Sequence, residues 1–390
     1  MKEQSAPGIR MTDADSSAVW SLQHRIVAFS YTMLTSATDE LKVTAYNNDL
    51  ALFAHPALYH GAALDVTWGY PGQMATPRRV FLEGFRGFTE LELTFSGRER
   101  PLNQTAKTHA WLDRKVAAVV REIAQSNGFT AANIDVDEVP TESTVVQAAE
   151  TDAALLKRLA EAHGFEFFVD GLGFHWRAPR KSQAPSVELV YGAPDGSILD
   201  ISFGSNLMRH VGSVAVRSRD PLQRRTVEAK ANTETVARDT LGQAIEVYDP
   251  ERYQTAHQRD NAKAAIHPSS AGSLEAATTE AATRFDSAES MAFEATVSLV
   301  GIPTLCARQL VRLSGVSTYL SGNYYVQQAC HSITDAGYIT ELQIIRDGAG
   351  ATEKSAPQGG RHNDQPAPQP GMKQLIEIYD TERYQRSRLP

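Results

Sequence analysis

The sequence predicts an α+β fold rich in β-structure, in which two β-barrel domains are separated by a mixed α/β section and accompanied by a helical insertion. Three observations support this prediction. Short runs of alternating apolar and polar residues recur in the first hundred residues and again after residue 184, as half-buried strands do. Segments with apolar residues at helical spacing lie between them. A stretch near the C-terminus is rich in glycine and proline and predicts a flexible tether.

The composition is that of an ordinary globular protein. The chain has 390 residues, 42% hydrophobic and 22% charged, which is enough for two or three domains with apolar cores. The formal net charge of −8 argues against sequence-specific nucleic-acid binding and against anionic membranes. Because no run approaches a membrane span and the first twenty residues lack the apolar run of a secretion signal, we expect the chain to stay in the cytoplasm where it is made.

Residues 1–100 predict a small β-barrel or sandwich, which we assign as the first barrel domain. Short alternating runs are separated by turn residues, first at Asn47-Asn48-Asp49 and then at Pro71-Gly72. Such alternation places one face of each strand against a core. The predicted strands cover residues 26–30, 41–45, 63–70 and 79–88.

Residues 101–183 predict a mixed α/β domain. Apolar residues at helical spacing indicate helices over residues 111–126 and 153–163. Asp152 is the predicted N-cap of the second helix, and Gly164 follows its end. The next residues, FEFFVD, GLG and FHWRA, predict a β-hairpin.

Strand patterns resume in residues 184–222 and 291–348, which we assign to the second barrel domain. Between them, residues 223–290 form a polar, alanine-rich insertion with a predicted helix over residues 273–287. The predicted strands of the second barrel cover residues 187–191, 198–203, 210–218, 292–299, 308–313, 324–333 and 338–346.

The C-terminal part is predicted to be a disordered linker, residues 349–372, followed by a docking tail, residues 373–390. Residues 348–371 contain five glycines and four prolines, and no valine, isoleucine, leucine or aromatic residue. Such a composition cannot form a core, and a flexible chain of this length reaches about 25 to 30 Å on average. The tail could therefore contact a surface away from its own domain.

A nine-residue repeat links the tail to the insertion. Ile376–Tyr384, IEIYDTERY, matches Ile245–Tyr253, IEVYDPERY, at seven of nine positions. One interpretation is that both copies dock in equivalent grooves, either as an added strand or as a short helix. The other is a fortuitous or recent duplication without a partner. The candidate docking residues are Ile245, Tyr248, Tyr253, Ile376, Tyr379 and Tyr384.

The sequence carries no catalytic signature. It lacks H-E-x-x-H, G-x-S-x-G, a Walker-type loop and a G-x-G-x-x-G after a strand. Cys330 and His331 are neighbours, but adjacent residues of a strand point to opposite faces and are poorly placed as nucleophile and base. Cys306 is the only other cysteine, so two free thiols are the simpler interpretation. We therefore expect no catalytic residue, no cofactor and no metal site.

Two segments resemble a known family. Residues 151–179, TDAALLKRLAEAHGFEFFVDGLGFHWRAP, are similar to the part of phage late control protein D and VgrG-type spike proteins where an aspartate precedes a leucine-rich helix and a hydrophobic strand. Residues 301–346 resemble the end of that family's second barrel, where G-x-Y-Y-V, a histidine and G-Y-x-T-x-L-x-L-x-R recur. The matching positions are Gly322, Tyr324, Tyr325, Val326, His331, Gly337, Tyr338, Thr340, Leu342 and Arg346.

The resemblance covers about residues 20–348 apart from the insertion, and it implies a structural baseplate hub protein of a contractile tail. In that family two similar, tube-like barrels per chain let a homotrimer form a pseudo-sixfold ring between the sixfold tail tube and the threefold spike. The resemblance therefore implies a structural protein rather than an enzyme. It also implies a virion tail or an extracellular injection particle, with synthesis in the bacterial cytoplasm. Phage, tailocin and toxin-delivering particle are equally compatible with the sequence.

One departure from the family pattern affects the expected partners. Type VI spike proteins continue after the hub into a further barrel domain and a β-helical needle, whereas here a tether begins at Gly348. The resemblance thus implies a separate spike protein below the hub and a tail tube protein above it. A baseplate wedge or a tail-completion protein is a further candidate partner for residues 373–390. The alternatives are a tail-associated peptidoglycan hydrolase and a spike or effector-loading protein of a secretion system.

Overall fold

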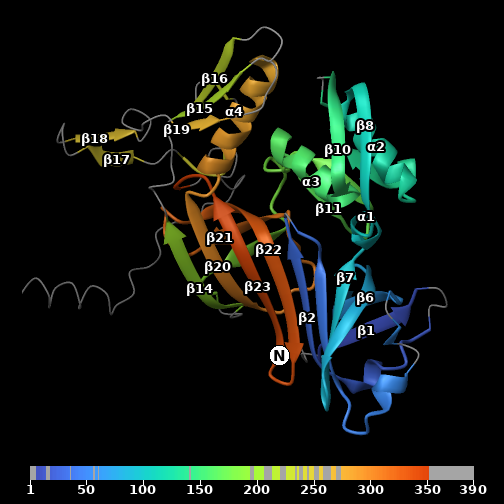
Figure 1. The fold of residues 1–390 in the computed structure, drawn as a ribbon. Helices are drawn as coiled ribbons and strands as arrows, with labels where there is room; N and C mark the ends of the chain where they lie inside the picture. The colour runs from blue at the N-terminus through green and yellow to red at the C-terminus, as the bar shows by residue number, and fades with distance from the viewer. Residues whose placement is uncertain are drawn as a thin grey trace, which may run out of the picture.

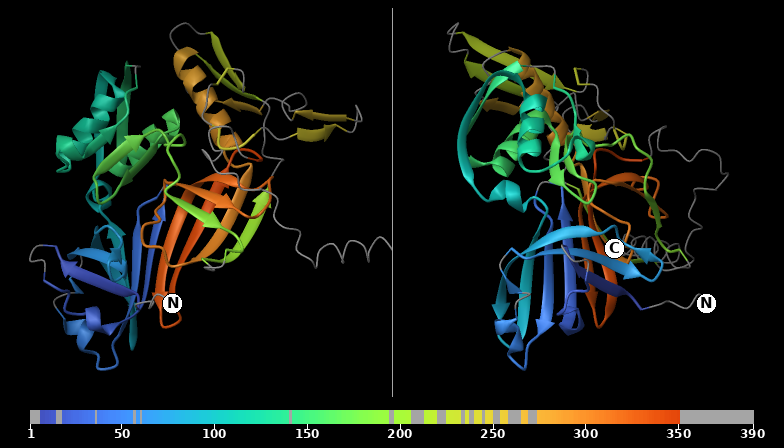
Figure 2. Two further views of the ribbon diagram at one scale, coloured as in Figure 1. Left: turned by 180° about the vertical axis from the view of Figure 1, so that it is seen from behind. Right: turned by 90° about the vertical axis from the view of Figure 1, so that its right-hand side faces the viewer.

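The computed structural model confirms an α+β fold dominated by strands (Figure 1). A large sheet is accompanied by two smaller units, and both units lie at the same end of that sheet in all views (Figure 2). None of the described helices is long and apolar enough to cross a membrane. The structure describes residues 6–14, 18–35, 37–55, 58–59, 61–139, 142–193, 197–205, 213–219, 225–232, 235–236, 240–243, 246–249, 254–257, 265–268 and 274–350.

Thirteen strands form the large sheet, and they fall into two groups along the chain. The N-terminal strand group comprises β1 (Gly8–Asp13), β2 (Ile26–Leu34), β3 (Glu40–Tyr46), β4 (Ala63–Tyr70), β5 (Gln73–Met74), β6 (Arg78–Gly87) and β7 (Glu90–Gly97), with short 3-10 helices at Gln23–Arg25 and Ala51–Ala54. The C-terminal strand group comprises β13 (Val187–Val190), β14 (Ile198–Ser205), β20 (Phe293–Val300), β21 (Leu310–Ser314), β22 (Gly322–Thr334) and β23 (Gly337–Arg346).

Alternating polarity explains why these segments are strands. In β7 the side chains of Leu91, Leu93 and Phe95 are fully buried, while Glu90 and Glu92 are exposed. The same alternation recurs in β20 and β23. Because successive residues of a strand point to opposite faces, each of these strands lays one apolar face on the core.

The two strand groups pair directly with each other, which the sequence did not predict. The strand order is β1-β4-β6-β7-β3-β2-β22-β23-β20-β14, with β21 beside β22, β13 beside β21 and β5 beside β4. β22 pairs along one edge with β23, and along the other edge with both β21 and β2. We call the antiparallel β2–β22 pairing, from Phe29↔Ile333 to Leu34↔Gln328, the seam.

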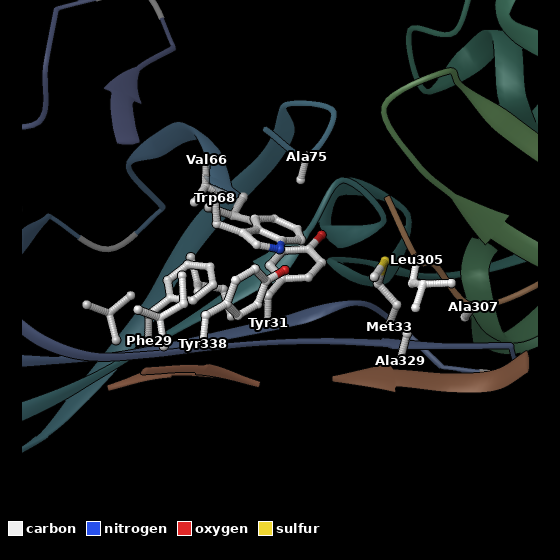
Figure 3. Packing of buried hydrophobic residues seen from close by; sticks show 14 of the residues in the cluster. Phe29, Tyr31, Met33, Val66, Trp68, Ala75, Leu305, Ala307, Ala329 and Tyr338 are labelled. Carbon is white, nitrogen blue, oxygen red and sulfur yellow. The ribbon is translucent and has the colours of Figure 1, made fainter. Parts of the chain in front are cut away.

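One hydrophobic core serves both strand groups. Trp68 of β4 stacks on Tyr31 with ring centroids 4.6 Å apart, and its centroid lies 5.6 Å from that of Phe29 and 5.2 Å from that of His331 in β22. Figure 3 shows Phe29, Tyr31, Trp68 and Tyr338 gathered on the same side of the strands. Burying each such side chain contributes about 1.5 to 3 kcal/mol. The seam therefore joins the groups through packing as well as through hydrogen bonds.

The segment after β7 forms an α/β unit with its own core, as predicted. A two-stranded ribbon and a three-stranded sheet pack with two helices around apolar side chains that include Trp111, Val120, Leu156 and Trp176. The elements are α1 (Arg100–Asn103), β8 (Ala106–Lys115), α2 (Val116–Ser126), a 3-10 turn (Ala131–Asn133), β9 (Ile134–Val136), β10 (Glu142–Thr151), α3 (Asp152–His163), β11 (Glu166–Val169) and β12 (Phe174–Arg177).

Two boundaries in this unit differ from the prediction. The first helix begins at Val116 rather than at residue 111, because the preceding residues extend β8, where Trp111 pairs with Val145 of β10. The N-cap of α3 is Thr151 rather than the predicted Asp152, and the Thr151 hydroxyl accepts a hydrogen bond from the Ala154 amide at 3.2 Å. Residues 111–115 could continue a helix or a strand, and their pairing with β10 makes them a strand. Threonine and aspartate are both common N-caps, and the hydrogen bond to the Ala154 amide makes Thr151 the cap.

Asp152 follows that cap inside the first turn of α3. Its carboxylate is buried, lies 2.5 Å from the Lys107 ammonium and accepts hydrogen bonds from Asn127 and Gln147. Burial raises its pKa, but these donors outweigh burial and lower the pKa below its usual value. Asp152 therefore ties α3 to the strand ribbon and to the end of α2.

The insertion folds as a second small unit. Residues 210–218, predicted as a strand of the second barrel, overlap β15, which pairs with β16 and β19 instead of with the large sheet. The reason is packing, since Val214 and Val216 of β15 share a core with Phe285 of the helix. The elements are β15 (Ser213–Arg219), β16 (Thr226–Asn232), β19 (Ala265–Pro268) and α4 (Leu274–Glu289), beside a hairpin of β17 (Glu246–Asp249) and β18 (Gln254–His257).

Candidate functional site

The family-motif positions lie on β22 and β23, at the centre of the molecule rather than on its surface. All of them except Gly337 are buried. They make two clusters of side-chain contacts and one contact with the α/β unit. The motif is therefore a set of residues that shapes the seam strand and its neighbour.

Gly322, Tyr324 and Arg346 form the first cluster. The Arg346 guanidinium donates hydrogen bonds to the carbonyl oxygens of Ser321 at 2.8 Å and Leu241 at 3.1 Å, and its carbon lies 5.3 Å from the centre of the Tyr324 ring. Gly322 has φ +142°, and a Cβ there would lie 2.6 Å from Nη2 of Arg346. Only glycine leaves room for the guanidinium. Burial lowers the pKa of Arg346, and the two carbonyl oxygens are the acceptors that its charge requires.

His331, Tyr338 and Thr340 form the second cluster. Nε2 of His331 lies 2.9 Å from the Leu305 carbonyl oxygen, which only accepts, so Nε2 carries the proton and donates. Nδ1 then accepts from the Tyr338 hydroxyl at 2.8 Å, while the Thr340 hydroxyl accepts from the Ile302 amide at 3.0 Å. Burial lowers the pKa of His331 to about 4. The imidazole is neutral near pH 7 and serves as a structural link.

Cys330 makes contacts that differ from those of its neighbour. Its thiol lies 3.5 Å from the hydroxyls of Ser30 and Thr32 across the seam, whereas the imidazole of His331 contacts the Leu305 carbonyl oxygen. Both cysteines are free thiols. The thiol and imidazole do not form the nucleophile and base of a hydrolase.

Tyr325 connects the C-terminal strand group to the α/β unit. Its buried hydroxyl donates to the Glu166 carboxylate of β11 at 2.5 Å. Burial raises the pKa of Glu166 and, more strongly, that of Tyr325. Tyr325 was predicted as a motif position, and the structure places it at a boundary between units.

Arg308 is a second connection that the sequence analysis missed. Its guanidinium carbon lies 4.0 Å from the centre of the Phe168 ring in β11, and Nη2 lies 3.3 Å from the Asp39 carboxylate and donates to the Leu34 carbonyl. The residue is 9% exposed and has φ +68°. A single arginine thus contacts both strand groups and the α/β unit, but an arginine in the segment CARQL shows nothing unusual in the sequence.

Asp170 completes the contact of the α/β unit with the large sheet. Arg78 of β6 lies 3.8 Å from its carboxylate, and His175 contacts it at 3.0 Å while facing Asp135 at 3.2 Å. Burial raises the pKa of Asp170, but the hydrogen bond and charge of His175 and the charge of Arg78 outweigh burial and hold the pKa at about 2. The α/β unit is therefore held by charged and hydrogen-bonded pairs.

Other features give no sign of a reaction centre in the described residues. No group of three or more His, Cys, Asp or Glu side chains is arranged there to hold a metal. A cavity of about 300 Å³ lies between α3 and the segment before β3, with Thr38, Glu99 and Lys157 in its wall. The Thr38 hydroxyl donates to Glu99, whose pKa burial raises.

Only one of the six candidate docking residues, Tyr248, lies among the described residues. The backbone of Tyr248 belongs to β17, opposite Thr255 of β18. The other five candidates lie outside the described residues, and these are Ile245, Tyr253, Ile376, Tyr379 and Tyr384.

Comparison with known families decides what this architecture belongs to. The model of the family described as phage tail baseplate hub (GPD) matches residues 69–337, more than half of the chain. The chain belongs to this baseplate hub family. The match covers the α/β unit, the insertion and most of the C-terminal strand group, and it ends at Gly337, the first residue of β23. The function is therefore that of a structural hub protein of a phage tail or a tail-like particle.

Solved structures show the same fold at low sequence identity. The tail protein from Neisseria meningitidis MC58 has a TM-score of 0.63 at 12% identity, over 90% of this hub chain and 100% of that chain. The 43 kDa tail protein of prophage MuSo2 from Shewanella oneidensis has a TM-score of 0.62 at 15% identity, over 88% and 99% of the two chains. The E. coli c3393 protein, a type VI secretion component, has a TM-score of 0.50 at 9% identity, over 86% and 76%. A search of curated protein sequences found no match.

Proposed function

We propose that three copies of this hub protein form a closed ring that adapts a sixfold tail tube to a threefold spike. The observation that carries the proposal is the pair of strand groups joined at the seam. If each group acts as one hub domain, the first within residues 1–100 and the second within residues 184–222 and 291–348, three chains present six such domains. The proposal thus assigns the change of symmetry to a single kind of chain.

The ends of the large sheet support ring formation. In the described strand order, β1 and β14 are terminal and neither has a second strand partner, although Val19 forms a single bridge to Thr12 at the C-terminal end of β1. Exposed edges of this kind pair with further strands unless they are covered. A ring of three copies brings a β14 edge of one chain toward the N-terminal strand group of the next, and it covers both edges.

The mass of the purified protein in solution tests the ring. We expect a particle of three times the 42.6 kDa chain mass, measured by light scattering with and without the spike protein of the same particle. Three-copy particles under either condition support the ring. A monomer under both conditions, or a stable dimer, contradicts it.

The partners of the ring follow from its position. We infer a tail tube protein on one side and a separate spike protein on the other, because a hub that adapts the tube to the spike contacts both of them. For residues 373–390, a baseplate wedge or a tail-completion protein is one candidate partner. Synthesis in the bacterial cytoplasm before assembly belongs to the same proposal.

A catalytic role is not part of the proposal. The family is structural, and the buried His331 and the half-buried Cys330 of β22 have separate structural contacts. A zymogram on peptidoglycan with the purified protein is expected to show no cleared band. A cleared band that persists after His331→Gln and Cys330→Ser would reveal an enzyme site elsewhere in the chain.

A further inference from the structure

β17 and β18 form a hairpin that stands apart from the other described strands. They pair antiparallel from Glu246↔His257 to Asp249↔Gln254, and neither pairs with another described strand. In Figure 1 the hairpin projects from the side of the insertion unit. A two-stranded hairpin is marginally stable alone, and its open edges readily accept another strand.

The sequence of β17 occurs a second time in the C-terminal tail. The strand residues 246–249 are EVYD, and residues 377–380 are EIYD within the longer nine-residue repeat. Isoleucine replaces valine, which keeps a β-branched residue suited to a strand. The first copy folds as a strand, so its near-identical second copy has the same local preference.

The segments that lead to the two copies start from one anchored point. Gln243 and Ala349 exchange two backbone hydrogen bonds of 2.7 and 2.9 Å. The Asp347 carboxylate accepts from the amides of Leu241 and Gly242 at 2.8 and 3.0 Å. A Cβ on Gly242 would lie 2.3 Å from the backbone of the facing segment, so the two segments are in tight contact. We call this contact, residues 241–243 with 347–349, the clasp.

The distances from the clasp allow the tail to reach the hairpin. Asp249, at the far end of β17, is six residues from Gln243, so it lies within about 21 Å of the clasp even with an extended chain. Glu377 is 28 residues beyond Ala349, and a flexible chain of that length spans about 30 Å on average. The distance from the clasp to the hairpin is thus similar to the mean end-to-end distance of the tether. Such a match gives a high effective concentration of the tail at the hairpin.

We propose that residues 376–384 of the same chain add to the β17–β18 hairpin as a third strand. β17 keeps its own place on β18, because the short loop between β17 and β18 closes at a much smaller entropy cost than the long tether does. The tail strand therefore occupies an open edge. This inference concerns one chain and does not depend on the proposed ring.

Amide hydrogen exchange of the full chain tests the third strand. The double variant Ile378→Pro with Tyr379→Pro removes strand donors of both parities from the tail. The matched control is Thr381→Pro, which gives the second copy the proline that the first copy carries at Pro250. We expect exchange in residues 246–249 and 254–257 to be at least tenfold faster in the double variant and unchanged in T381P. Exchange in β22 and β23 reports the fold and should be equal in all three proteins.

Two further measurements complete the test. Removal of residues 373–390 should accelerate exchange in the hairpin as the double variant does, and the free peptide IEIYDTERY should restore the protection. Equal hairpin exchange in the wild type, the double variant and the truncated chain overturns the proposal. Protection that rises with protein concentration shows binding to a neighbouring chain and overturns the assignment to the same chain.

Discussion

At the scale of single residues, the family motif describes packing around β22 and β23. Gly322 makes room for the Arg346 guanidinium, which in turn binds the carbonyl oxygens where the chain enters β22. His331 links Leu305 to Tyr338 across the core. These residues hold the seam strand in shape, so their substitution is expected to affect stability before it affects any partner.

Gly322 offers a prediction with a matched control on the same pair of strands. Gly322 and Gly337 both have positive φ, but a Cβ on Gly337 would meet no atom within 4 Å. We expect Gly322→Ala to lower the free energy of unfolding by about 3 kcal/mol, since backbone strain and overpacking each cost about 1 to 3 kcal/mol. Gly337→Ala should cost about 1 kcal/mol from strain alone. Urea denaturation of both variants measures the difference, and equal losses would contradict the role of Arg346.

His331 predicts a dependence of stability on pH. Its pKa is about 4 in the folded chain, because burial disfavours the charged ring, and about 6.5 in an unfolded chain. As pH falls from about 6.5 to 4, the unfolded state takes up a proton that the folded state refuses, so this residue destabilises the fold by up to about 3 kcal/mol. In His331→Gln this part of the pH dependence is absent. The stability gap between wild type and variant, measured by denaturation, should therefore narrow toward pH 4, and a constant gap would contradict the assignment.

At the scale of secondary-structure elements, the sequence predicts strands well where one face is buried. The runs at 63–70, 79–88, 292–299 and 338–346 correspond to β4, β6, β20 and β23, because period-two alternation is a local property. The helix α3 was predicted from its helical spacing of leucines, and the hairpin of β11 and β12 from a hydrophobic run followed by glycine turn residues, which are local patterns too. The local pattern was less successful where a pairing partner determines the secondary structure. Residues 111–115 were predicted as helix but extend β8, because they pair with β10.

The contacts between elements could not be predicted from one sequence. β15 has the alternation of a barrel strand, yet it packs on α4 in the insertion unit, because only the fold brings Val216 to Phe285. The seam likewise depends on Tyr31 and His331 meeting across 300 residues of chain. Arg308 was missed because its partners, Phe168 and Asp39, lie far from it in the sequence. The sequence supplied the motif positions, but the contacts that they make come from segments distant in the chain.

At the scale of the whole molecule, the seam makes the two strand groups one structural body. They share one hydrophobic core, whereas the α/β unit and the insertion unit have separate cores. A ring built from such chains would transmit load from one hub domain to the other through a continuous sheet. The smaller units, at one end of the sheet, could move without breaking that core.

This organisation predicts that the strand groups unfold together. Leu93 of β7 is fully buried in the shared core, and Val119 of α2 is fully buried in the core of the α/β unit. We expect Leu93→Ala to cost about 2 to 5 kcal/mol and to accelerate amide exchange in β20 and β23 as much as in β3, because removing a buried side chain weakens the whole cooperative body. Val119→Ala also leaves a cavity, but in the core of the α/β unit. It should accelerate amide exchange in α2 and α3 while the amides of β20 and β23 stay protected. If Leu93→Ala leaves β20 and β23 unchanged, the strand groups are independent domains that touch at the seam without sharing stability.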